Sequence, residues 1–66
     1  MRVVINGEQR EINAAVNINQ LLETLELAEA RVAVELNREL IRRQKWSEVT
    51  INENDRVEIV HFVGGG

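Results

Sequence analysis

Residues 17–25 read NINQLLETL and decide the fold, because they hold the clearest helical signal in the chain. Four aliphatic residues recur there at the spacing that lays side chains along one face of a helix. They are Ile18, Leu21, Leu22 and Leu25. Asn17 can cap the helix, and Gln20 three residues later can complete a capping box. We therefore predict one amphipathic helix over residues 18–27.

Alternating patterns typical of strands lie on both sides of this helix. Before it, residues 1–6 and 9–13 should pair as a hairpin around Asn6-Gly7, since both residues tolerate positive φ. We expect Ile12 to be the apolar anchor of the second strand. After the helix, residues 31–36 alternate, and a polar turn at residues 37–39 leads to a short strand containing Leu40 and Ile41.

The last strand follows the turn at residues 53–55 and has two different faces. Val57, Ile59 and His61 share one face, and Glu58, Val60 and Phe62 share the other. Inward packing accounts for Val57 and Ile59. It leaves Val60 and Phe62 on the opposite face, where apolar side chains favour a partner-binding surface.

Together these elements predict an α+β fold, a roll in which one main helix crosses a sheet of four or five strands. The stretch between residues 42 and 55 is too irregular for a long element and indicates a short helical turn with a loop. Trp46 is expected to close the open end of the small core rather than to stack on a ligand. The basic residues Arg42, Arg43 and Lys45 fit a solvated turn better than a docking site for an acidic partner.

Length and composition narrow the classes of function. A chain of 66 residues can form one domain with a thin core. It has no cysteine, and its net charge of −3 argues against a nucleic-acid partner. No apolar run reaches the length of a membrane span and no signal-peptide pattern opens the chain, so we expect a monomer in the cytoplasm without membrane contact.

Catalytic and metal-binding patterns are scarce, so we expect a protein that is not an enzyme. Ser47 is the only serine and His61 the only histidine, and we expect His61 to be partly covered and hydrogen bonded at the strand end. The helix carboxylates, Glu23, Glu26 and Glu29, fit a solvated face without a metal. No glycine-rich loop joins a strand to a helix, so the chain should bind no ATP or other cofactor by itself.

The closing residues, 63–66, read VGGG, and we expect a flexible tail there, following a domain over residues 1–62. Glycine lacks Cβ, so Gly64 and Gly65 would let the carboxylate of Gly66 enter a narrow channel of another enzyme. That carboxylate is ionised at neutral pH and would need activation before acting as an acyl group. Composition alone favours frayed or linker glycines, a common feature of chain ends.

The whole chain resembles a known family, the thiamine-pathway sulfur carriers of the ThiS/MoaD group in the ubiquitin-like β-grasp superfamily. The resemblance rests on VINGE at residues 4–8, VAVELN at 32–37, RQKW at 43–46 and above all DRVEIVHFVGGG at 55–66. Members often carry glycine before the aspartate of the last turn, where this chain has Asn54. Asparagine tolerates the left-handed conformation, so the difference is small.

The resemblance implies a β-grasp fold and a carrier role for Gly66. An E1-like adenylyltransferase, ThiF-like, would use ATP to adenylate Gly66, and sulfur relayed from a cysteine desulfurase or other donor would convert it to a thiocarboxylate for a ThiG-like thiazole synthase. Val60, Phe62 and Val63 would then dock on these enzymes. Two alternatives are a sulfur carrier for molybdopterin synthesis and a ubiquitin-like modifier or interaction module.

Overall fold

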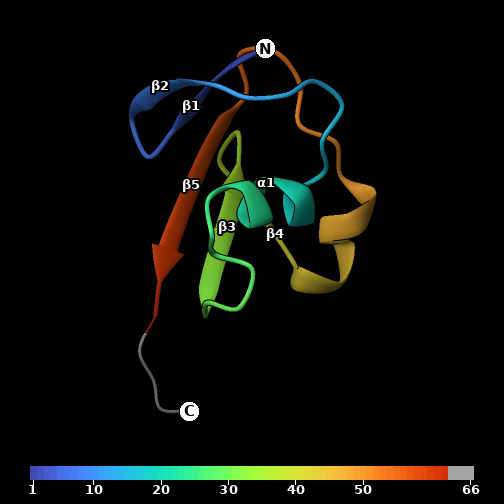
Figure 1. Cartoon of the computed structure of the whole chain (residues 1–66). Coiled ribbons are helices and arrows are strands. Elements are labelled where there is room, and N and C mark those ends of the chain that lie inside the picture. Colours follow the sequence, from blue (N-terminus) through green and yellow to red (C-terminus); the bar gives the residue numbers. More distant parts are fainter. Residues whose placement is uncertain (63–66) are drawn as a thin grey trace.

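The computed structural model describes residues 1–62, which form a five-stranded mixed sheet with one α-helix against one face (Figure 1). The strands are β1 (Arg2–Ile5), β2 (Glu8–Glu11), β3 (Val32–Leu36), β4 (Glu39–Ile41) and β5 (Arg56–His61). Their order is β2-β1-β5-β3-β4, in which β1 and β5 run parallel and the other neighbours antiparallel. The predicted α+β roll is confirmed. The predicted tail at residues 63–66 lies outside the described residues.

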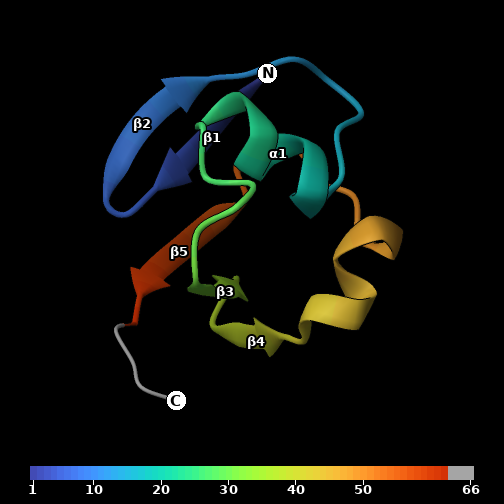
Figure 2. The same ribbon diagram turned by 60° about the horizontal axis from the view of Figure 1, so that its bottom comes forward.

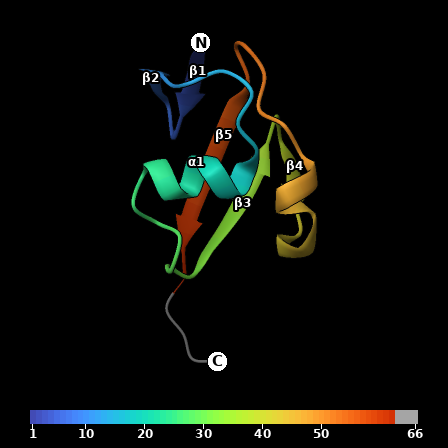
Figure 3. The same ribbon diagram turned by 45° about the vertical axis from the view of Figure 1, so that its right-hand side comes forward.

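The helix α1 (Ile18–Thr24) crosses the sheet over β3 and β5 (Figure 3). It begins as predicted with a capping box, in which the Gln20 backbone N–H donates to Asn17 Oδ1 and the Asn17 N–H donates to Gln20 Oε1, each at 2.8 Å. Three of the four predicted apolar residues are buried, and Leu25 is partly buried. The beginning and the buried face of the helix therefore follow the sequence pattern.

The end of α1 differs from the prediction, because the helix stops at Thr24 rather than at residue 27. Glu26 takes a left-handed φ of 62°. The Leu27 N–H then donates to the Leu22 carbonyl at 2.7 Å, and the Glu26 N–H donates to the Glu23 carbonyl at 3.0 Å. These two bonds form a Schellman motif, which closes a helix with a left-handed residue that is usually glycine.

The first hairpin is shorter than predicted, with strands at 2–5 and 8–11 instead of 1–6 and 9–13. Asn6 and Gly7 both have positive φ, 50° and 83°, as their sequence predicts. Ile12 lies just beyond β2, where its N–H donates to the Met1 carbonyl at 2.8 Å and its side chain packs against the core. Ile12 is thus the apolar residue that anchors the end of this strand, as predicted, whereas all four residues of β2 are exposed.

Trp46 closes the core beside the sheet, as expected. It lies in a 3₁₀ helix, η1 (Arg43–Glu48), and is only 4% exposed. Its indole N–H donates to the Ile41 carbonyl at 2.9 Å. Figure 2 shows η1 following β4 at the side of the sheet that α1 covers, and the two helices are in contact. No helix within residues 1–62 has the length and apolar character needed to cross a bilayer.

Candidate functional site

Strand β5 carries the exposed apolar residues singled out in the sequence. It runs from the end of the molecule that holds the N-terminus to the opposite end (Figure 1). Val60 is 59% exposed and Phe62 is 53% exposed, which confirms that both project away from the core. Their role in partner binding stays a prediction. Val63, Gly64, Gly65 and Gly66 lie outside the described residues.

A third apolar side chain joins this face from β4. Leu40 is 62% exposed and lies opposite Glu35 of β3, which in turn lies opposite Glu58 of β5. Paired residues share a face of a sheet, so Leu40 and Val60 project from the same outer face. We call Leu40, Val60 and Phe62 the exposed apolar set. The sequence pattern assigned Leu40 only to a short strand.

The outer face is also acidic at its centre. Glu35 and Glu58 are directly opposite each other in the β3–β5 register, and both are exposed. Like charges at such positions destabilise a sheet by a few tenths of a kcal/mol to about 1 kcal/mol. The fold tolerates this repulsion beside the exposed apolar set.

The end of β5 is held by a side chain that the sequence analysis did not single out for this role. Asn6 Oδ1 accepts a hydrogen bond from the Ile59 N–H at 2.7 Å, and Asn6 Nδ2 donates to the Ile59 carbonyl at 3.2 Å. Strand β1 ends at Ile5, opposite Val57, so the Asn6 amide continues the ladder where the strand stops. This contact fixes the segment that leads to Val60 and Phe62.

A second asparagine fixes the start of β5. Asn37 Oδ1 accepts from the Arg56 N–H at 2.9 Å, and Asn37 Nδ2 donates to Asp55 Oδ1 at 3.0 Å. Asn37 itself has a φ of 51° in the turn between β3 and β4. Asparagine meets both requirements at this position, because it tolerates the left-handed region and offers an amide donor and acceptor.

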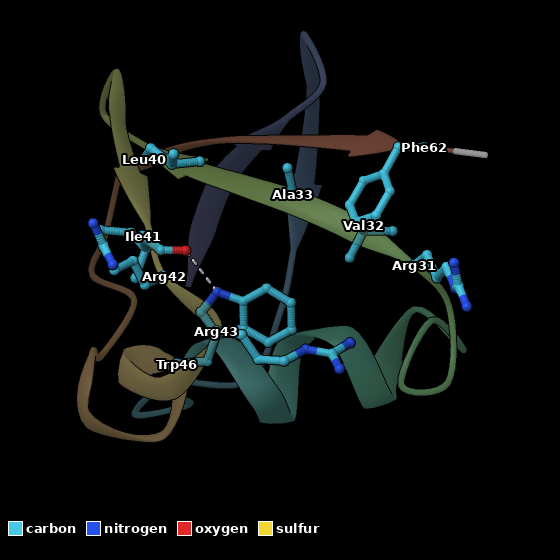
Figure 4. A pocket seen from close by; sticks show the side chains of 9 residues that line it. All are labelled: Arg31, Val32, Ala33, Leu40, Ile41, Arg42, Arg43, Trp46 and Phe62. Carbon is cyan, nitrogen blue, oxygen red and sulfur yellow. Dashed lines mark hydrogen bonds between the residues drawn. The ribbon is translucent and has the colours of Figure 1, made fainter. Parts of the chain in front are cut away.

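An open groove of about 440 Å³ lies beside the exposed apolar set, between β3 and η1 (Figure 4). Among residues 1–62, its lining combines apolar and cationic side chains and contains no acidic residue. The nine lining residues are Arg31, Val32, Ala33, Leu40, Ile41, Arg42, Arg43, Trp46 and Phe62. We call this the cationic groove. The Arg43 guanidinium lies over the Trp46 ring at 5.2 Å from its centroid.

The basic cluster predicted from the sequence is therefore divided in the structure. Arg42 and Arg43 line the cationic groove, but Lys45 does not, and its Nζ lies 3.8 Å from Glu48 Oε1. Arg31 completes the groove from the chain segment before β3. No local spacing could reveal Arg31 as a neighbour, because it is eleven residues from Arg42 in the sequence.

The remaining candidate residues lie on the surface. His61 is exposed, so the expectation that it is partly covered was wrong; β5 reaches past the cover given by α1 at this point. Ser47 is exposed in η1. The carboxylates of Glu23, Glu26 and Glu29 are exposed, in agreement with a solvated face.

Comparison with known proteins identifies the family. The family model for ThiS matches residues 3–66, nearly the whole chain. The chain belongs to the ThiS family. The crystal structure of the thiamine biosynthesis protein ThiS from Geobacter metallireducens superposes with a TM-score of 0.88 at 35% identity, covering all of both chains. The predicted β-grasp architecture is thereby confirmed.

Two further relatives place this ThiS-family chain among proteins of different length. The sulfur carrier protein ThiS of Bacillus subtilis is 45% identical over 49 residues, which is 74% of each protein. A thiazole synthase of Paramagnetospirillum magneticum is 41% identical over all 66 residues of this chain. The chain spans only 20% of that relative's length. A ThiS-like segment is thus part of a larger protein named as an enzyme.

Proposed function

We propose that this protein is the sulfur carrier for formation of the thiazole ring of thiamine, with Gly66 as its working residue. The observation that carries the proposal is that the ThiS family match runs through residue 66 and so includes the closing glycines. In this role the protein is a cosubstrate in the cytoplasm, and partner enzymes supply the catalysis. The carrier itself would hold no cofactor.

The proposed chemistry takes place at the carboxylate of Gly66. A carboxylate is a poor electrophile, so an E1-like adenylyltransferase would first join it to the AMP portion of ATP with loss of pyrophosphate. A cysteine desulfurase holds sulfur as a persulfide, from which a thiol reductant would release sulfide as the thiol is oxidised to a disulfide. The sulfide would then attack the carbonyl carbon. A carbon–sulfur bond forms, the carbon–oxygen bond to AMP breaks, and AMP leaves with that bond's electron pair. The product is a thiocarboxylate on Gly66.

The exposed apolar set would bring the carrier to its enzymes. Val60 and Phe62 come directly before residues 63–66, so a partner that holds them also receives the closing glycines. A ThiS-like segment occurs within a protein named thiazole synthase. This supports thiazole synthase as the enzyme that takes the sulfur, because two functions joined in one chain commonly work in sequence.

The test is the intact mass of the full chain after incubation with ATP, an E1-like adenylyltransferase, a cysteine desulfurase with cysteine, and a thiol reductant. We expect a gain equal to the exchange of one oxygen atom for sulfur. The mass of the starting protein also establishes whether Gly66 bears the terminal carboxylate. Attachment to lysines of other proteins would instead indicate a modifier, and no change with any activating enzyme would refute the carrier role.

Two variants separate chemistry from docking. Deletion of Gly66 should abolish the mass gain, because it removes the residue whose carboxylate is adenylated. The change Val60→Ser should leave the folding stability within about 0.5 kcal/mol, since Val60 is exposed. At low carrier concentration the variant should gain mass more slowly than the parent. At high carrier concentration its rate should return to that of the parent. The matched control Val4→Ser changes a partly buried valine in β1, away from the exposed apolar set.

A further inference from the structure

Three arginines from separate parts of the chain line the cationic groove, with Arg31 at one end and Arg42 at the other (Figure 4). Arg31 comes from the segment before β3, Arg42 from the residue after β4, and Arg43 from the first position of η1. They make up three of the eight Lys and Arg residues of a chain whose net charge is −3. In the part of the chain that the structure describes, the groove lining has no Asp or Glu to balance them. The structure thus places a positive site on an acidic protein.

Within residues 1–62, none of these arginines has a salt-bridge partner. The ion pairs found within residues 1–62 involve the N-terminal ammonium, Arg10 and Lys45, and none of the three. Arg43 lies over the Trp46 ring in a cation–π contact, which helps to position its guanidinium group. Guanidinium groups match carboxylates, to which they can donate paired hydrogen bonds.

The groove also offers apolar contact. Figure 4 shows Phe62 over Val32 on one side and Leu40 on the other, with Trp46 below them. Phe62 and Leu40 are both more than half exposed. A bare anion would meet the arginines and leave this apolar surface uncovered. A peptide segment with carboxylates and an apolar side chain would match both parts of the lining.

We propose that the cationic groove binds an acidic segment of a protein partner. Its carboxylates pair with Arg31, Arg42 and Arg43, and one of its apolar side chains packs between Phe62 and Leu40. The groove is continuous with the exposed apolar set through these two residues. Charge complementarity selects the occupant, because a basic segment would be repelled. The inference does not depend on sulfur transfer at Gly66.

The test is a titration of the full chain, labelled with ¹⁵N, with a short capped peptide of alternating glutamate and leucine. We expect the backbone amides of Arg31, Arg42 and Arg43 and the indole N–H of Trp46 to shift together. Added salt should weaken the binding, because the ion pairs are exposed. The corresponding peptide with lysine in place of each glutamate should produce no saturable shift.

Charge reversal locates the site. Each of the changes Arg31→Glu and Arg42→Glu should lower the affinity for the glutamate peptide by about fivefold or more, because one exposed ion pair is lost and its charge reversed. The control Arg38→Glu makes the same change of charge in the turn between β3 and β4, outside the groove, and should have little effect. Unchanged fluorescence of Trp46 in all three variants shows that they remain folded.

Four results would overturn the proposal. They are an absence of shifts with the glutamate peptide, equal binding of the lysine peptide, equal weakening by Arg38→Glu, and the same shifts with sodium phosphate alone. Shifts that depend on protein concentration without peptide would assign the groove to a second copy of the chain instead. Because none of these measurements uses ATP or a sulfur donor, the groove proposal and the carrier proposal can fail separately.

Discussion

The contact between Asn6 and Ile59 gives the sharpest test of how the fold positions the end of β5. The change Asn6→Gly removes both hydrogen bonds to the Ile59 backbone while leaving a residue suited to the φ of 50°. Ile59 is 6% exposed, so water replaces these bonds poorly. At about 1 kcal/mol for each bond, we expect a loss of about 2 kcal/mol in the free energy of unfolding.

The change Asn6→Ala should cost about 1 kcal/mol more, because a side chain with Cβ is strained in the left-handed region. A total loss of about 3 kcal/mol is large for this protein, since domains of its size have a free energy of unfolding of roughly 3–10 kcal/mol. The control is Asn54→Ala, which changes another left-handed asparagine, at φ 69°. No side-chain hydrogen bond of Asn54 occurs within residues 1–62, so only the strain of about 1 kcal/mol should be lost.

The assay is urea denaturation followed by the fluorescence of Trp46, the only tryptophan in the chain. Hydrogen exchange at the Ile59 amide gives a local readout. A loss of 2 kcal/mol predicts exchange about thirtyfold faster in Asn6→Gly, provided that exchange requires opening of this contact. A variant within 0.5 kcal/mol of the parent, with equal protection of Ile59, would refute the view that Asn6 continues the sheet.

Three further changes test other parts of the fold by the same unfolding assay. Asn17→Ala should destabilise the protein by about 1 kcal/mol through loss of the helix cap, and an unchanged midpoint would contradict the capping geometry. Glu26→Gly should stabilise it by about 0.5–1 kcal/mol, because glycine relieves the left-handed residue of the Schellman motif. Glu58→Lys should stabilise it by about 0.5 kcal/mol through an opposite-charge pair with Glu35, whereas Glu29→Lys, the same change of charge at an exposed turn, should not.

The start of α1 and the direction of the β5 side chains could be predicted because each depends on residues close together in the chain. Asn17 and Gln20 cap the helix within one turn, whatever the rest of the fold does. The alternation that exposes Val60 follows from the period of a strand. The end of α1 was mispredicted, since Leu25 continued the helical spacing while the Schellman motif at Glu26 has no glycine to mark it.

The candidate functional site also has one part that could be predicted from neighbouring residues and one part that could not. Its proposed working end, Val60, Phe62 and the glycines to residue 66, can be found in one continuous segment of sequence. The cationic groove could not be found there, because Arg31 and Arg42 line the same groove only after β3 and β4 pair.

The sequence by itself determined the elements, the outward face of β5 and the family resemblance, because these depend on local periodicity and on short motifs. Only the tertiary structure decided which distant polar groups meet. Asn6 bonds to Ile59, 53 residues away, and Arg31 rather than Lys45 joins Arg42 and Arg43. The physical reason is that hydrogen bonds and ion pairs act over a few ångströms in space. Sheet pairing and register set those distances, and no local pattern in the chain encodes them.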